Sequence, residues 1–215
     1  MTTVKICGLR TEEHALAALE AGADFLGFIF APSRRQVQPE TVATIVAAVR
    51  AAPGGDRIRC VGVFVNESAE RMVEIARIAG LDALQLSGDE PIAILDTLRQ
   101  LAPDLEVIKA LRLTGSDDEV PWLDAPVSIR LLIDAHVPGS YGGAGVVGDW
   151  QQAAQLARQR QVLLAGGLHP GNVAQAIAEV QPWGVDVSSG VETEGTKDSA
   201  KIRSFIATVR AIETS

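Results

Sequence analysis

The sequence predicts an α/β fold and, more narrowly, a single (β/α)8 barrel domain spanning residues 1–215. Short apolar runs alternate eight times with longer segments of helical periodicity, and such alternation is typical of parallel strands joined by right-handed crossovers. Ala, Val, Leu and Ile dominate, while aromatic residues make up only 4%, which suits strands covered by helices on both faces. A doubly wound sheet is the alternative, and it differs in that its first and last strands do not pair.

Each predicted strand is a short apolar run bounded by turn residues or a helical segment. The strands are Val4–Cys7, Phe25–Phe30, Ile58–Val65, Ala83–Leu86, Glu106–Ala110, Arg130–Asp134, Val162–Ala165 and Val185–Val187. The helices are Glu12–Glu20, Glu40–Ala51, Ala69–Ile78, Ile92–Leu101, Trp150–Gln159, Asn172–Glu179 and Ser199–Ile212, with a weaker one at Asp117–Leu123. Turns at Pro53-Gly54-Gly55, Pro138-Gly139 and Pro170-Gly171 separate them.

Charge and composition exclude several classes of function. The formal net charge of -8 argues against nucleic acid as a partner, since phosphate backbones attract clustered Lys and Arg. No apolar stretch reaches transmembrane length or forms a signal peptide, so we expect a cytoplasmic protein with reduced thiols and no membrane partner. Neither cysteine, Cys7 or Cys60, has a second Cys or a His at a metal-ligand spacing, and His14, His136 and His169 are scattered. We therefore expect no metal site. Cys60 lies inside the third predicted strand, and we interpret it as a core residue.

Cys7 ends the first predicted strand, where parallel α/β folds place their chemistry. It is a candidate nucleophile or base, although a lone cysteine more often packs in the core like alanine. Strand alternation puts Lys5 on the same face as Cys7, where its ammonium would favour the thiolate. A lysine inside a barrel needs a partner, and Asp186 on the eighth strand is the hypothesised one. The alternative is that Lys5 and Asp186 form only a structural ion pair.

Three glycine-rich segments need separate interpretations. The segment Gly143–Gly148 matches G-x-G-x-x-G, but it does not directly follow a first strand and lacks the downstream acidic residue of a dinucleotide site. We interpret Pro138–Gly148 as a flexible active-site loop instead. Gly166-Gly167 follows the seventh strand and Ser188-Ser189-Gly190 the eighth, where barrels commonly bind phosphate through backbone N–H groups. The alternative is a pair of tight turns.

Taken together, these segments resemble the phosphoribosylanthranilate isomerase family of tryptophan biosynthesis, whose members are TIM barrels. The resemblance follows the family's order from one end of the chain to the other. It is carried by Lys5-Ile6-Cys7-Gly8, Gly22-Ala23-Asp24 with Gly27-Phe28, Ser33-Arg34-Arg35, Val61–Asn66, Gln85-Leu86, Leu132-Ile133-Asp134, Tyr141-Gly142-Gly143, Gly166-Gly167-Leu168 and Val185–Glu192.

The resemblance implies an Amadori rearrangement of N-(5-phosphoribosyl)anthranilate, with Cys7 as general base and Asp134 as general acid. Asp134 must then be protonated when substrate binds, and the pKa of Cys7 must be lowered toward the thiolate. The resemblance also implies that Arg35, or its neighbour Arg34, holds the anthranilate carboxylate. The family's phosphate site matches Gly166, Gly167, Ser188, Ser189 and Gly190, and strand alternation adds Lys5 and Asp186 as candidate substrate-binding residues. Without the resemblance, Asp134 would be a turn former and Arg35 a solvated surface charge.

The same resemblance implies no external cofactor, a small-molecule phosphosugar-anthranilate substrate, and a monomer or homodimer. Three positions depart from the family pattern: Ser87 replaces a histidine, His136 stands near a usual lysine, and Ala144 replaces Thr or Ser. We expect these departures to affect substrate affinity and loop behaviour more than the reaction class.

Three other functions share parts of this pattern. Indoleglycerol-phosphate synthase has similar phosphate turns but relies on lysines and glutamates that the strand ends here do not supply. A noncatalytic phosphosugar-binding barrel would need neither Cys7 nor Asp134. A dual isomerase that also acts on a histidine-pathway substrate typically uses two aspartates, whereas the first position here is Cys7.

Overall fold

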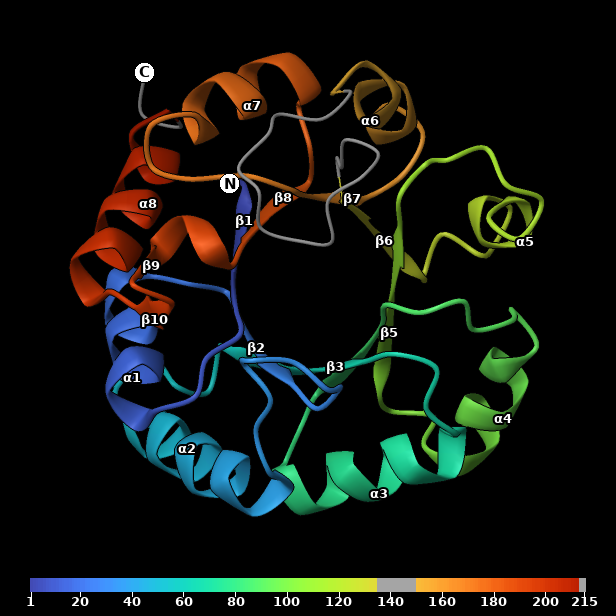
Figure 1. Ribbon diagram of the computed structural model, residues 1–215, viewed down its shortest axis with the longest axis horizontal. Helices are drawn as coiled ribbons and strands as arrows, with labels where there is room; N and C mark the ends of the chain where they lie inside the picture. The colour runs from blue at the N-terminus through green and yellow to red at the C-terminus, as the bar shows by residue number, and fades with distance from the viewer. Residues whose placement is uncertain (135–149, 213–215) are drawn as a thin grey trace.

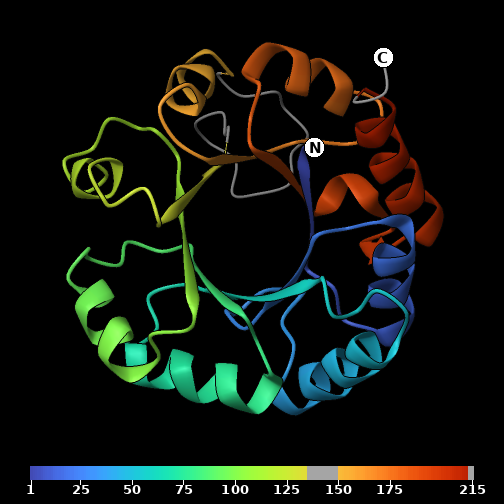
Figure 2. The ribbon, with the colours of Figure 1, turned by 180° about the vertical axis from the view of Figure 1, so that it is seen from behind.

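The computed structural model describes residues 1–134 and 150–212, which form a closed barrel of parallel strands inside a ring of helices (Figure 1). Each strand from β1 to β8 pairs with the next along the chain, and β8 pairs with β1. The barrel prediction is therefore confirmed, and the doubly wound alternative is wrong. Seen from the opposite end, the helices again lie outside the strands (Figure 2).

The barrel strands are β1 Thr3–Cys7, β2 Phe25–Ile29, β3 Arg59–Phe64, β4 Ala83–Leu86, β5 Glu106–Leu111, β6 Arg130–Asp134, β7 Val162–Ala165 and β8 Gly184–Val187. The helices are α1 Glu12–Ala21, α2 Pro39–Ala51, α3 Ala69–Ala79, α4 Ile94–Leu101, α5 Val120–Leu123, α6 Trp150–Ala157, α7 Val173–Val180 and α8 Ser199–Ile212. Every predicted strand is present, with ends within one residue of those expected. Among the described residues, no helix is long and apolar enough to cross a bilayer.

Two helices begin at least two residues later than predicted, for local reasons. The chain after Pro91 first makes a tighter turn, in which the Ile94 N–H donates to the Pro91 carbonyl at 3.0 Å, so α4 begins only at Ile94. The predicted Asp117–Leu123 helix shrinks to α5 because the Glu119 carboxylate accepts bonds from the N–H groups of Arg112, Leu113 and Gly115. Glu119 therefore ties down the preceding loop instead of extending a helix.

The chain after β8 carries two elements that the sequence analysis does not predict. A short 3-10 helix, η1, spans Ser189–Val191, and a two-stranded hairpin follows, with β9 at Glu192–Thr193 and β10 at Thr196–Lys197. Both central residues of the hairpin turn, Glu194 and Gly195, have positive φ values of 51° and 78°, as a type I′ turn requires. The hairpin lies at the rim of the barrel beside α8 (Figure 1) and pairs Glu192 with Lys197.

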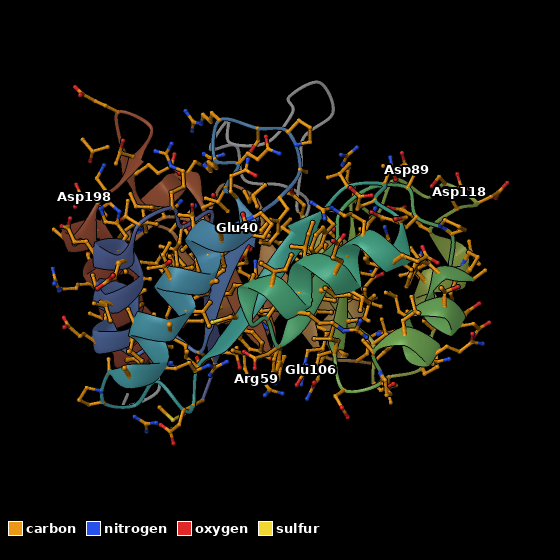
Figure 3. The ribbon with its side chains drawn as sticks, turned by 90° about the horizontal axis from the view of Figure 1, so that it is seen from below. Glu40, Arg59, Asp89, Glu106, Asp118 and Asp198 are labelled. Atoms are coloured by element: carbon orange, nitrogen blue, oxygen red, sulfur yellow. The ribbon has the colours of Figure 1, made fainter. Side chains whose placement is uncertain are left out.

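Strand alternation fills the barrel interior in layers. A middle layer is apolar and contains Val61, Ala83, Ile108, Leu132 and Leu163. At the amino-terminal ends of the strands, Glu106 forms ion pairs with Arg59 and Arg130. At the carboxyl-terminal ends the inward residues include Gln85, Asp134 and Asp186, so this end of the barrel can support chemistry. Figure 3 shows the two ends, with Arg59 and Glu106 at one and Asp89 and Asp118 at the other.

Candidate active site

Lys5 and Asp186 form a buried ion pair at the carboxyl end of the barrel. They lie directly opposite each other in the β1–β8 register, and Lys5 Nζ is 2.8 Å from Asp186 Oδ1. The Lys5 side chain is fully buried, and the Asp186 side chain is 9% exposed. Burial alone would lower the pKa of Lys5, but Asp186 and Cys7 outweigh it and raise the pKa, so the ammonium keeps its charge. The predicted partnership is confirmed.

Cys7 lies beside this pair, as alternation requires. A Cβ placed on Gly27 of the neighbouring strand would be 2.9 Å from the Cys7 Sγ and 3.2 Å from Lys5 Nζ, so only glycine leaves room for both groups. Burial raises the pKa of Cys7 above its ordinary value, and Lys5 opposes this shift without overcoming it. The expected lowering of the pKa is therefore not found in the free protein, because burial outweighs the effect of Lys5 and the negative charge of Asp186 adds to the rise.

Asp134 ends β6 and lies on the wall of a cavity of about 660 Å³ at the same end of the barrel. The cavity also contacts Asp186, Gln85 and Ser87, so the acid candidate shares this space with Asp186 of the buried ion pair. Ser87 accepts a hydrogen bond of 3.0 Å from Gln85 Nε2. Gln85 is 5% exposed, and its Oε1 has no partner in the part of the chain that the structure describes. The sequence analysis includes Gln85 only among the segments that carry the resemblance, and it does not predict that the Gln85 Oε1 is a buried acceptor without a partner among the described residues.

Arg35 does not project freely into solvent. Its Nε and Nη2 donate to the two carboxylate oxygens of Glu192, at 2.6 and 2.9 Å, and its side chain is only 15% exposed. Arg34 also reaches Glu192, at 2.9 Å, but its side chain is 60% exposed. Between the two arginines, Arg35 is thus the better placed for a partly buried carboxylate site, next to Gly8 at the end of β1.

The two predicted phosphate turns lie against each other. Gly166 and Gly167 have φ values of 91° and 65°, which side chains rarely adopt. Gly190 packs so tightly on the other turn that a Cβ there would lie 1.8 Å from the Leu168 carbonyl oxygen. Within the described ranges, the backbone N–H groups of Gly167, Ser189 and Gly190 donate no hydrogen bond. These donors are therefore available to an anion.

Lys197 is a cation of the site that sequence reasoning missed. It is 6% exposed, and its Nζ contacts the Ser188 carbonyl oxygen at 2.8 Å, the Ser188 Oγ at 3.3 Å and Glu192 at 2.8 Å. Burial lowers its pKa, although Glu192 and Cys7 favour its charge. The only signal in the sequence was the short spacing to Ser188, and the hairpin that turns Lys197 back toward the barrel was not predicted.

A second buried ion pair lies outside the barrel lumen. Lys109 Nζ is 2.7 Å from Glu90 Oε2 and lies 5.3 Å from the centre of the Trp122 ring. Although burial alone would raise the pKa of Glu90, its hydrogen bonds to Lys109 and Asn66 lower it. The lysine interrupting the apolar strand Val107–Leu111 was the available signal for this pair, which lines the outer part of the cavity.

Several sequence-based predictions fall outside the described residues. These are the Pro138–Gly148 loop, its Gly143–Gly148 motif, and the departures at His136 and Ala144. Cys60 is fully buried, with its pKa raised to about 12 by burial, as expected of a core thiol. In residues 1–134 and 150–212, no cluster of His, Cys, Asp and Glu could hold a metal ion.

Comparisons with known proteins agree along almost the whole chain. A family model described as N-(5'phosphoribosyl)anthranilate (PRA) isomerase matches residues 4–208. The N-(5'-phosphoribosyl)anthranilate isomerase of Roseiflexus sp. (strain RS-1) is 58% identical over 214 residues, covering 98% of this chain and 99% of the relative. The crystal structure of phosphoribosyl anthranilate isomerase from Thermotoga maritima is 40% identical, with a TM-score of 0.84, covering 98% of this chain and 100% of that one.

A further crystal structure is similar over the same extent. It is a phosphoribosyl anthranilate isomerase in complex with reduced 1-(o-carboxyphenylamino)-1-deoxyribulose 5-phosphate. It is 37% identical to this chain, with a TM-score of 0.80, covering 98% of this chain and 100% of that one.

Proposed function

Because the chain belongs to the phosphoribosylanthranilate isomerase family of tryptophan biosynthesis, we propose that Cys7 and Asp134 carry out the two proton transfers of its reaction. The reaction converts N-(5-phosphoribosyl)anthranilate to 1-(2-carboxyphenylamino)-1-deoxyribulose 5-phosphate. Asp134 would protonate the furanose ring oxygen, which opens the ring, and Cys7 would remove the C2 proton from the resulting iminium. No cofactor is needed, since the iminium itself accepts the electron pair.

The observation that carries the proposal is the shared location of these groups. Cys7 adjoins the Lys5–Asp186 pair, and Asp186 and Asp134 line one cavity at the carboxyl end of the barrel. An acid and a base must approach the same sugar from different strands, and β1 and β6 supply them.

The thiolate needed for proton abstraction fits the substrate complex better than the free protein. Burial keeps Cys7 protonated at neutral pH in the absence of substrate. Ring opening places a positive iminium next to C2, and a nearby positive charge favours the thiolate. Lys5 and Lys197 act on Cys7 in the same direction. We therefore place thiolate formation after substrate binding.

The two anionic groups of the substrate have matching donors near the end of β1, since a Cβ on Gly8 would meet both Arg35 and Ser188. We propose that the Gly166-Gly167 turn, together with Ser188, Ser189 and Gly190, binds the phosphate through backbone N–H groups. We propose that Arg35 binds the anthranilate carboxylate. The complex of the relative with a reduced carboxyphenylamino-deoxyribulose phosphate supports a ligand that carries both anions.

The test is fluorescence turnover of freshly generated phosphoribosylanthranilate by the wild type, Cys7→Ala, Asp134→Asn and Cys60→Ala proteins. General acid–base groups typically contribute about 10²–10⁴-fold, so the first two substitutions should lower kcat by at least about 100-fold. Cys60→Ala is the matched thiol control and should keep kcat within about threefold, because Cys60 is a core residue of β3. A folded Cys7→Ala protein with near wild-type kcat would exclude Cys7 as the base.

We further propose a cytoplasmic location and a monomeric or homodimeric state. Both agree with a biosynthetic enzyme that acts on a small phosphosugar. Sedimentation velocity would decide between the two states.

A further inference from the structure

Glu192 is the residue on which three cations of the site converge. Its carboxylate contacts Arg35, Arg34 and Lys197 at distances between 2.6 and 2.9 Å, and its side chain is only 5% exposed. The β9–β10 hairpin holds it there by pairing it with Lys197 in register. Burial alone would raise the pKa of Glu192, but Arg35 and Lys197 lower it to about 2, so the carboxylate is charged at all physiological pH values.

The Arg35 guanidinium is fixed by these contacts on one edge only. Its Nε and Nη2 are both bonded to Glu192, and within the described residues Nη1 makes no hydrogen bond. The stem of Arg35 is confined as well, because its Cδ lies 2.7 Å from the position a Cβ on Gly8 would take. A planar group held along one edge presents the opposite edge in a defined direction, and this lowers the cost of ordering it when a ligand binds.

Displacement of Glu192 by a substrate carboxylate fits these contacts poorly. Glu192 is bonded to Lys197 as well as to both arginines, and the Lys197 side chain is only 3% exposed. Removing the carboxylate would leave Lys197 and Arg35 as close, buried like charges, which is costly. A second carboxylate can instead bind the remaining Nη1 of Arg35 while Glu192 stays in place.

We propose that Glu192 is a positioning residue, which orients Arg35 so that its Nη1 edge receives the carboxylate of the anthranilate ring. The inference rests on the role proposed above for Arg35, and it adds a residue to which no role in the reaction has been given. Glu192 touches neither reacting atom, so its effect should fall on substrate binding and only slightly on the chemical step.

The test is a double-mutant cycle in KM and kcat with wild type, Glu192→Gln, Arg35→Ala and the double variant. Glutamine offers one acceptor instead of two and turns an NH₂ group toward the guanidinium, so Arg35 loses its defined orientation. We expect Glu192→Gln to raise KM about tenfold with kcat within about threefold, and the double variant to match Arg35→Ala within about twofold. Glu194→Gln is the matched control, since it makes the same chemical change on the exposed turn of the same hairpin.

Inhibition by inorganic phosphate separates positioning from support of the loop. We expect its inhibition constant to change by less than about twofold in Glu192→Gln, because the glutamine oxygen can still accept from Lys197, which keeps its contact with Ser188. A parallel rise in that constant, or additive KM effects in the double variant, would overturn the inference while leaving the Arg35 proposal intact. An unchanged KM in Arg35→Ala would refute both. If Glu192→Gln fails to fold, Glu192→Asp replaces it, because it keeps the charge but not the reach.

Discussion

The charge state of Cys7 depends on how its neighbours share their charges. Lys5 was expected to lower the pKa of the thiol, and it does act in that direction. Its ammonium is also bonded to Asp186, whose negative charge acts on Cys7 in the opposite sense. Burial then decides the outcome and keeps the free thiol protonated. The sequence shows which residues share a face, but the balance of these effects depends on distances and burial.

Replacement of Lys5 with Met should make Cys7 harder to deprotonate. The substitution removes a cation and leaves Asp186 uncompensated, so the apparent pKa for alkylation of Cys7 should rise by about one unit or more. Iodoacetamide labelling against pH, followed by mass spectrometry, measures this value, and Cys60 contributes little because its pKa is about 12. The Lys5→Met/Asp186→Asn variant should titrate at a lower pH than Lys5→Met alone. An unchanged pH dependence in Lys5→Met would assign the ion pair a purely structural role.

At the scale of elements, the site depends on loops that hold each other in place. The turn after β7 and the 3-10 helix after β8 meet where Gly190 contacts the Leu168 carbonyl oxygen. The hairpin β9–β10 then brings Lys197 back to Ser188. Each element is short and weakly stable alone, so the geometry of the donors comes from packing between them.

The substitution Gly190→Ala should disturb the proposed phosphate site without changing the acid or the base. The added Cβ would lie 1.8 Å from the Leu168 oxygen, so one of the two turns must move. We expect the inhibition constant for inorganic phosphate and the KM for substrate to rise about tenfold or more, the equivalent of roughly 1.4 kcal/mol. Gly171→Ala is the control, because its Cβ would meet only the His169 ring, at 3.2 Å. Equal phosphate inhibition of Gly190→Ala and wild type would place the phosphate elsewhere.

At the scale of the whole molecule, periodicity was enough to predict the barrel but not its irregular rim. Every strand was found because apolar runs such as Leu131–Ile133 are set by burial on both faces of the sheet. Cys7 and the two phosphate turns were singled out because they end strands, whereas the proposed acid role of Asp134 came from the family resemblance. Glu192, Lys197 and Gln85 were missed, since their roles depend on contacts across the rim that have no local sequence pattern.

The two ends of the barrel also divide stability from function. Although burial alone would raise the pKa of Glu106, its hydrogen bonds and charge interactions with Arg59 and Arg130 lower it. This cluster closes the amino-terminal end, where Arg130 also lies 4.9 Å from the Trp183 ring. Figure 3 shows Arg59 and Glu106 at the end of the barrel away from Asp89 and Asp118, two residues that line the large cavity.

Replacement of Glu106 with Gln should therefore lower the thermal midpoint and leave catalysis unchanged. The cluster is partly exposed to solvent, so we expect a loss of about 1 kcal/mol, or about 2–4 °C for a chain of this size. Because the folded pKa of Glu106 lies below its ordinary value, its stabilisation is present above that value and is lost as the pH falls through the folded pKa. The difference in thermal midpoint between wild type and Glu106→Gln should accordingly be largest near neutral pH. It should disappear in acid, where Glu106 is protonated. Glu74→Gln, which breaks an exposed pair with Arg71, is the control and should shift the midpoint by less than about 1 °C. A fall in kcat with an unchanged midpoint would show that the amino-terminal end contributes to function after all.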